Sequence, residues 1–143
     1  PSGNGIAAFA LLRLGHILGE HKYLEAAERA LKLFYPDLSG RLSGYTSMMI
    51  ALEEFLTPPQ IVILYGETNA LTEWQSELQR DYLPHTLVLA LQENLAGLPQ
   101  SLERKAAGIV NAWVCQGVKC LPPIDNLQQL KQVCTSGGAD KIG

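Results

Sequence analysis

The fold is decided by residues 60–91, which read QIVILYGETNALTEWQSELQRDYLPHTLVLAL. Residues 61–65 (IVILY) form a continuous apolar run, which is typical of a strand that is covered on both faces. Thr68 is suited to cap a helix, and apolar side chains then recur at helical spacing, at Leu71, Trp74, Leu78 and Tyr82. Pro84 ends that helix, and residues 86–91 (TLVLAL) form a second apolar run. This pattern predicts two parallel strands joined by a crossover helix.

The residues that follow predict the rest of a small sheet. Residues 109–115 have the composition of a third strand, and a turn at residues 116–119 leads to a short partner strand at Cys120 and Leu121. Asp125, with Gln128 three residues later, forms a capping box at the start of a last helix. We therefore expect an α/β domain over residues 60–134, with a mostly parallel, Rossmann-like sheet and flanking helices. Residues 135–143 are small and polar, which indicates a flexible tail.

The first part of the chain is predicted to be entirely helical. Apolar periodicity indicates helices over residues 6–18, 21–34 and 43–56, the second ended by Pro36 and the third by Pro58 and Pro59. We expect residues 1–57 to form a three-helix segment, which makes the whole chain an α plus α/β protein.

The first of these helices is apolar on almost every side. Its large apolar residues cannot all face the interior of a three-helix unit: Ile6, Phe9, Leu11, Leu12, Leu14, Ile17 and Leu18. The surplus face predicts association with other helices, in the simplest case as a symmetric homodimer.

Composition restricts the class of protein. The 143 residues carry a net charge of −3, so no basic surface points to nucleic acid or to anionic lipid. No apolar run reaches the roughly 18 residues that a membrane helix needs, so no membrane partner is expected. Three cysteines do not make a secreted disulfide framework, which favours a reducing, cytoplasmic compartment. The chain begins at Pro1 without a methionine, and we expect it to be a fragment of a longer protein.

Two features of the α/β part are candidate sites. Gly66, Glu67 and Thr68 lie between a strand and a helix, where doubly wound sheets bind ligands. They lack a G-x-G-x-x-G run, and Glu67 would repel a phosphate, so a plain strand-to-helix turn is the favoured interpretation. Cys115 and Cys120 flank a four-residue turn and would face each other across a hairpin.

Three interpretations of the two cysteines remain open: buried structural thiols, a disulfide or redox pair, and part of a metal site. A zinc site would need Cys134 and His85 to complete the ligand set, without a spacing rule that supports it. The sequence shows no pair of catalytic carboxylates, no Ser/His/Asp arrangement and no nucleophile elbow. We therefore assign no catalytic residue, no metal ligand and no cofactor.

Three groups of residues, taken in order, resemble a known family. The groups are Pro1-Ser2-Gly3-Asn4 followed by Ala7-Ala8 and residues 11–14 (LLRL), the strand Ile61-Val62-Ile63, and residues 112–115 (AWVC) followed by Cys120-Leu121-Pro122. This order is similar to the C-terminal end of the thioredoxin domain-containing proteins related to spermatogenesis-associated protein 20. The resemblance extends to about Cys134. Members of that family combine a thioredoxin-like domain with an α/α toroid of the N-acylglucosamine 2-epimerase and six-hairpin glycosidase kind.

The resemblance implies a role for each part of the chain. Residues 1–57 would close the toroid, and the α/β domain would be a C-terminal addition that supports domain assembly without catalysis. The partners would be the upstream thioredoxin-like and toroid domains. Ser2 and Asn4 would lie at the inner rim of the toroid, where they would contact a sugar-like ligand or merely cap a helix. Two alternatives remain open: a carbohydrate-processing pocket completed by upstream residues, and a redox or metal module that uses Cys115 and Cys120.

Overall fold

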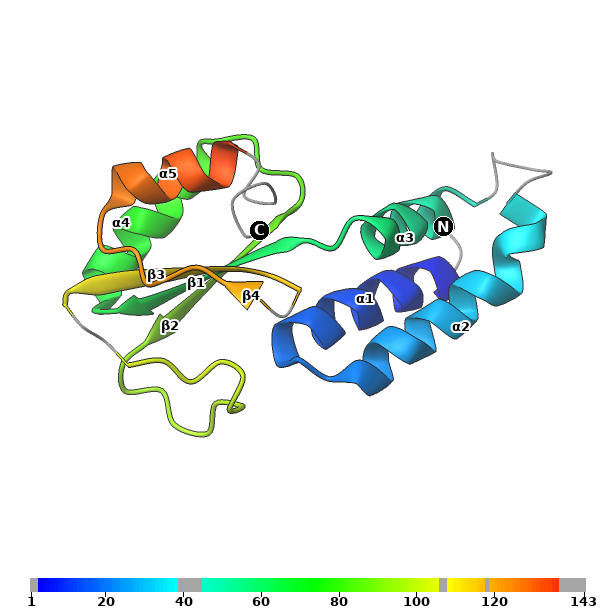
Figure 1. Cartoon of the computed structure of the whole chain (residues 1–143), viewed down its shortest axis with the longest axis horizontal. Helices are drawn as coiled ribbons and strands as arrows, with labels where there is room; N and C mark the ends of the chain where they lie inside the picture. The colour runs from blue at the N-terminus through cyan, green and yellow to red at the C-terminus, as the bar shows by residue number, and fades with distance from the viewer. Residues whose placement is uncertain (1–2, 39–44, 106–107, 118, 137–143) are drawn as a thin grey trace. The chain divides into compact units, whose positions relative to one another are not determined.

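A computed structural model describes residues 3–38, 45–105, 108–117 and 119–136 of the chain (Figure 1). The chain divides into two compact units, Pro1–Pro58 and Pro59–Gly143. The first unit contains α1 (Gly3–Leu18), α2 (His21–Leu38) and α3 (Thr46–Leu56). The second contains, in chain order, β1 (Gln60–Gly66), α4 (Thr68–Gln79), β2 (Thr86–Gln92), β3 (Val110–Gln116), β4 (Lys119–Cys120) and α5 (Leu127–Thr135).

In the helical unit, α1 packs through its small residues. Its buried positions are Gly5, Ala8, Leu12 and Gly15, which recur at helical spacing. A Cβ atom on Gly5 would lie 2.6 Å from the backbone nitrogen of Met48 in α3, and one on Gly15 would lie 2.6 Å from a methyl carbon of Leu24 in α2. The two glycines therefore allow both neighbouring helices to approach α1 closely.

A partly buried ion pair also joins α1 to α3. Arg13 Nε donates to Glu54 Oε1 at 2.9 Å and Arg13 Nη2 donates to Glu54 Oε2 at 2.9 Å, so the guanidinium and the carboxylate meet as a two-pronged pair. Glu54 is only 5% exposed, and the Arg13 guanidinium lies over the Phe9 ring at 4.0 Å. Removal of Arg13 would leave the buried Glu54 carboxylate without its counter-charge, which destabilises the packing of α1 on α3.

The helix boundaries differ from the sequence prediction in three places. α1 begins at Gly3, three residues before the predicted start at residue 6. Pro36 does not end α2, which continues to Leu38 with the proline inside its last turn. A proline there removes only its own N–H donor, and no further turn has to form after it. The predicted start of the third helix, at residue 43, lies outside the described residues, and α3 begins at Thr46.

The second unit is built on a four-stranded sheet with the order β2-β1-β3-β4. β1 pairs with β2 in parallel, as the crossover pattern predicts, but it pairs with β3 antiparallel, and β3 pairs with β4 antiparallel. The expected mostly parallel, Rossmann-like sheet is therefore not confirmed, and the fold is α+β with a mixed sheet. A further parallel pairing needs another crossover, usually a helix, whereas the described part of the connection from β2 to β3 contains no helix.

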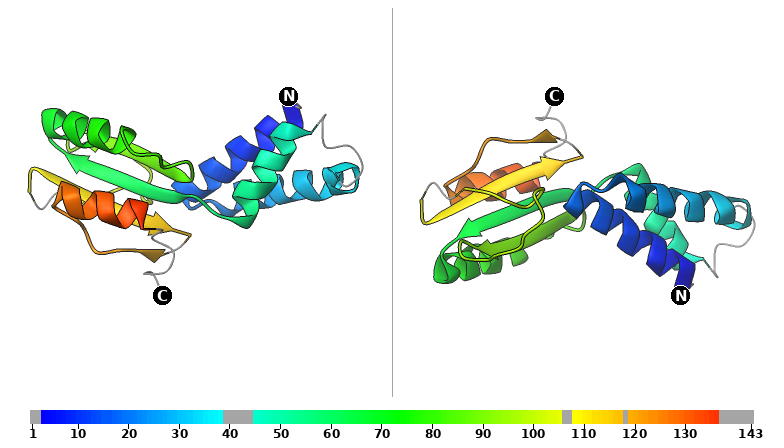
Figure 2. Two further views of the ribbon diagram at one scale, coloured as in Figure 1. Left: turned by 90° about the horizontal axis from the view of Figure 1, so that it is seen from above. Right: turned by 90° about the horizontal axis from the view of Figure 1, so that it is seen from below.

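Both helices of the second unit cover the same face of the sheet (Figure 2). Val62 and Leu64 of β1 have no exposed surface and share one cluster with apolar residues of β3, α4 and α5: Val110, Ala112, Val114, Leu71, Leu78, Leu130 and Cys134. Because side chains alternate along a strand, Trp113 and Cys115 of β3 lie on the opposite face.

Three predicted ends of helices in this unit are also wrong. The N-cap of α4 is Glu67, and Thr68, expected as the cap, is the first residue of the helix. α4 stops at Gln79, and Tyr82, expected on its apolar face, is 90% exposed. The chain leaves the helix there because the N–H groups of Arg80 and Asp81 bond the carbonyls of Glu77 and Leu78 in tighter turns. At α5 the cap is Asn126, not Asp125: its side chain accepts a hydrogen bond from the Gln129 N–H at 3.0 Å.

Replacing Gly5 by alanine should lower the free energy of unfolding of the helical unit by about 1–3 kcal/mol, the usual cost of overpacking. The new methyl group would meet the backbone of α3, which can give way only if the helix moves. Urea unfolding followed by circular dichroism measures the change. Gly3→Ala is the matched control, because nothing lies within 4 Å of a Cβ there. Equal stabilities of the two variants would contradict the close packing of α1 on α3.

Candidate functional site

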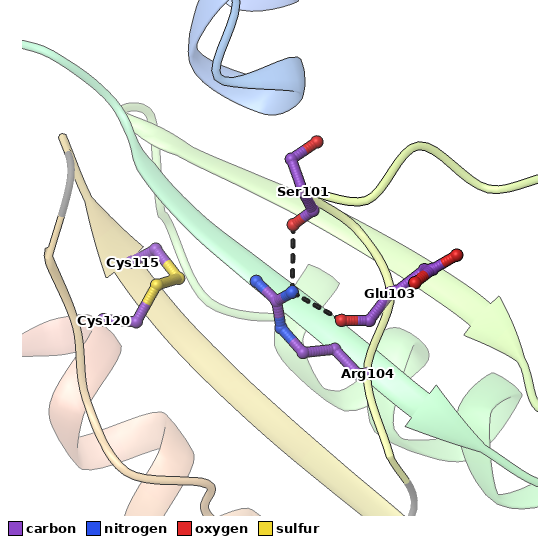
Figure 3. Close-up of a disulfide and its surroundings, with 5 residues drawn as sticks. All are labelled: Ser101, Glu103, Arg104, Cys115 and Cys120. Atoms are coloured by element: carbon purple, nitrogen blue, oxygen red, sulfur yellow. Dashed lines mark hydrogen bonds between the residues drawn. A yellow bond between two sulfur atoms is a disulfide. The ribbon is translucent and has the colours of Figure 1, made fainter.

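The candidate site is the hairpin formed by β3 and β4. Gln116 pairs with Lys119, and Cys115 pairs directly with Cys120. Gly117 occupies the first position of the two-residue loop with φ of 59°, a conformation that both favoured hairpin turns require there. The two cysteines form a disulfide with an S–S distance of 2.00 Å (Figure 3). The turn residues thus fix the register that brings the two sulfurs together.

The two halves of the disulfide differ in exposure. Cys115 is 7% exposed and belongs to β3, which is paired on both sides, whereas Cys120 is exposed on the two-residue edge strand β4. Beyond β4, the Leu121 N–H still donates to the Val114 carbonyl at 2.9 Å. A dissolved thiol would therefore reach the disulfide from the Cys120 side.

Arg104 is a cation on the same side of the sheet as the disulfide. Its guanidinium carbon lies 5.8 Å from the centre of the Trp113 ring, and Trp113 precedes Cys115 by two residues on one face of β3. Arg104 Nη1 donates to the carbonyls of Ser101 at 2.9 Å and Glu103 at 2.8 Å (Figure 3). Sequence analysis did not identify Arg104, because residues 92–108 show neither a helical nor a strand period.

Cys134 lies in a different environment from the other two cysteines. It is 7% exposed and packs in the cluster between the sheet and its helices, on the face away from Cys115. Burial, with a smaller contribution from the Asp81 carboxylate, raises the pKa of the Cys134 thiol to about 11. At neutral pH this thiol is protonated, and it is shielded from the disulfide by the sheet.

The geometry does not assemble the zinc ligands considered from the sequence. Within the described residues, no group of three or more His, Cys, Asp and Glu side chains is arranged to hold a metal ion. As members of a disulfide, Cys115 and Cys120 do not offer the thiolates that zinc prefers.

Of the two residues expected at the toroid rim, the structure describes only Asn4. Ser2 lies outside the described residues. Asn4 is exposed in the first turn of α1. Asn4 is thus inside the helix and does not occupy the position of a cap.

The strand-to-helix turn at Gly66, Glu67 and Thr68 borders a hollow of about 430 Å³ at the carboxyl ends of β1 and β2. Glu67 and Glu93 both line this hollow, and none of the described residues around it is basic. Two carboxylates at the amino end of α4 oppose the binding of a phosphate, in agreement with the interpretation as a plain turn.

Comparisons with known proteins do not identify a relative: no family model, no curated protein and no solved structure matches this chain. Within the described residues, none of the helices combines the length and the apolar character that crossing a bilayer requires.

Cys134 should be unreactive in the folded protein and reactive after unfolding, because only the thiolate attacks alkylating reagents. Iodoacetamide at pH 8, followed by mass spectrometry, should add no group without urea and one group with it. The folded protein also keeps a proton that the unfolded chain loses above its ordinary pKa of about 8.5. The free energy of unfolding should therefore fall as the pH rises from there towards 11. Rapid labelling of the folded protein at pH 8 would contradict this assignment.

Proposed function

We propose that this chain is a non-catalytic assembly module whose Cys115–Cys120 disulfide exchanges reversibly with a thiol partner. The observation that carries the proposal is the position of the bond, between a buried cysteine and an exposed cysteine on a short edge strand. Exposed disulfides are the ones that enter exchange, because the attacking thiolate must reach a sulfur atom. Within this chain, the proposed exchange therefore requires only the two cysteines and no further catalytic residue.

The exchange would proceed through two successive displacements at sulfur. A partner thiolate attacks the sulfur of Cys120, the Cys115–Cys120 bond breaks, and Cys115 leaves as a thiolate that takes up a proton. A second thiol of the partner then attacks the mixed disulfide and releases Cys120. Two partner thiols are oxidised to a disulfide while Cys115 and Cys120 are reduced. The reverse reaction is favoured by the hairpin, because its register holds the two sulfurs opposite each other.

A cytoplasmic location would favour a reversible disulfide over a permanent structural one. The composition favours a cytoplasmic location, and we propose this location for the protein. Disulfides in the cytosol of mesophiles are usually transient, and serve catalysis or redox sensing. A permanent structural role would suit a secreted protein better, where the bond would resist reduction.

The resemblance suggests the partner. In the family that the chain resembles, a thioredoxin-like domain would lie upstream in the same protein. Such a domain carries two thiols of the kind that the exchange needs. We therefore propose that domain as the reductant of Cys115 and Cys120.

Exchange is tested by trapping. When the chain with its intact Cys115–Cys120 disulfide is mixed with a reduced thioredoxin whose resolving cysteine is replaced, the thioredoxin thiolate should displace Cys115 and form a mixed disulfide on Cys120. Acid quenching, alkylation of the released Cys115 and peptide mapping should locate the mixed disulfide there. A mixed disulfide on the buried Cys115, with Cys120 as the alkylated cysteine, should be at least tenfold less abundant. Cys134→Ser is the control and should leave the reduction of the wild-type disulfide unchanged.

The reduction potential provides the second readout. We expect a midpoint more positive than about −300 mV, because structural disulfides lie below that value. A more negative midpoint together with failure to trap on Cys120 would show that the bond is structural.

For the helical unit we propose that α1, α2 and α3 are the last helices of an α/α toroid. This proposal is supported by apolar side chains that their own unit leaves exposed, among them Ile6 at 54% in α1 and Ile50 at 48% in α3. In the complete protein, the preceding hairpins of the toroid would cover them. The alternative of a carbohydrate-processing pocket stays a proposal that rests on the resemblance, with Asn4 as its only described residue.

In isolation the chain should associate through these helices as a symmetric dimer. Burying a large apolar side chain contributes about 1.5–3 kcal/mol, and several such side chains lie exposed in the helical unit: Ile6, Leu14, Leu33, Tyr35, Met49, Ile50 and Leu56. Sedimentation velocity at micromolar concentration should show the dimer, and Ile6→Glu or Ile50→Glu should shift it to monomer. Glu25→Gln, on the polar face of α2, is the control. A wild-type monomer at these concentrations would contradict association.

A further inference from the structure

A hollow of about 560 Å³ lies beside the sheet, between Tyr65 at the end of β1 and the loop that follows β2. Its walls include the apolar side chains Leu95 and Leu98, and its cations are Arg104 and Lys105. This combination of an apolar wall and a cationic end is typical of a small-molecule site, in which a few polar groups orient an apolar ligand.

Arg104 is held in place, and no carboxylate of the described residues neutralises its charge. Its described hydrogen bonds use Nη1 and the carbonyls of Ser101 and Glu103. Among the residues that the structure describes, no carboxylate is in ion-pair contact with it. Partial burial lowers the pKa of the Arg104 guanidinium from its ordinary value, so its charge is incompletely solvated.

Among the described residues, Glu103 is the one carboxylate that borders the hollow. Figure 3 shows that its backbone carbonyl faces Arg104 while its carboxylate points to the other side. The guanidinium therefore keeps Nε and Nη2 for an incoming group, and a planar fork of N–H donors matches the two oxygens of a carboxylate.

The site is supported by neighbouring structure. The Tyr65 hydroxyl donates to the Glu93 carbonyl at 3.0 Å, which ties the first residues of the loop to β1. Trp113 lies under the Arg104 guanidinium at 5.8 Å and holds it from the β3 side. The cation is thus held by Trp113 of β3 and by the carbonyls of Ser101 and Glu103 in its own loop.

We propose that this hollow binds a small organic acid, with the carboxylate on Arg104 and a short aliphatic chain against Leu95 and Leu98. The apolar walls favour an acid with a hydrocarbon chain over an inorganic anion. Burial of the hydrocarbon chain against the leucines would contribute binding free energy that an inorganic anion cannot obtain there. The site is separate from the proposed thiol exchange and does not depend on it.

Tryptophan fluorescence of the whole chain tests the proposal, because Trp113 contacts Arg104. The chain contains two tryptophans, so Trp74→Phe leaves Trp113 as the single reporter. In this background, hexanoate should change the emission saturably with a dissociation constant of about 1 mM or tighter. Hexanol and inorganic phosphate should each bind at least tenfold more weakly. Hexanol has the aliphatic chain without the carboxylate, and phosphate has the negative charge without the chain.

Two variants separate the two parts of the site. Arg104→Gln should weaken hexanoate binding at least tenfold, while Arg80→Gln, at an exposed residue that follows α4 and pairs with Glu77, should not. Leu95 is 48% exposed, so Leu95→Asp should abolish binding without unfolding the protein, which circular dichroism checks. The proposal is overturned if hexanoate produces no saturable change, if phosphate binds equally well, or if folded Leu95→Asp binds like the parent.

Discussion

β1 bonds to a neighbouring strand along both of its edges, in parallel to β2 and antiparallel to β3, over all seven of its residues. A strand with two partners has no free backbone donors or acceptors to expose, so its side chains can be apolar on both faces. Val62 and Leu64 meet the helices on one face, and Ile61 and Ile63 are buried on the other. The rest of the second unit is placed by reference to this strand.

Because β3 pairs with β1, its side chains point alternately to the two faces of the sheet. The disulfide and the free thiol of Cys134 therefore lie on opposite faces. β3 is aligned residue by residue on β1, so Val114 enters the cluster with α5 and Cys115 points to the opposite side. Cys134 is on the α5 side, where desolvation suppresses its thiolate. Cys115 can therefore pair only with a residue that crosses β3 on its own face, and the hairpin supplies Cys120.

The sequence predicts local structure well where the pattern is periodic and bounded. The strand at residues 61–65, the helix after Thr68 and the parallel strand at residues 86–91 all occur. The direction of β3 could not be predicted, because a strand has the same composition in either direction and only the connection decides. Cys115 and Cys120 could be placed opposite each other from the turn between them, whereas Arg104 meets Trp113 by a loop path that no period encodes. The sequence places the N-cap of α5 one residue too early, at Asp125 and not at Asn126, because aspartate and asparagine cap helices equally well.

The packing of the helical unit explains why its large apolar residues are left outside. Close approach of α1 to α2 and α3 is possible only along a stripe of small residues, with Gly5, Ala8 and Gly15 at the contacts. A stripe of this kind brings the backbones together, and it leaves little room there for the larger side chains of α1. The Arg13–Glu54 pair fixes the register of α1 on α3, because its two-pronged geometry tolerates no slip along the helix. Ile6 and Leu14 are consequently directed away from this contact, and their exposure follows from the same close packing that stabilises the unit.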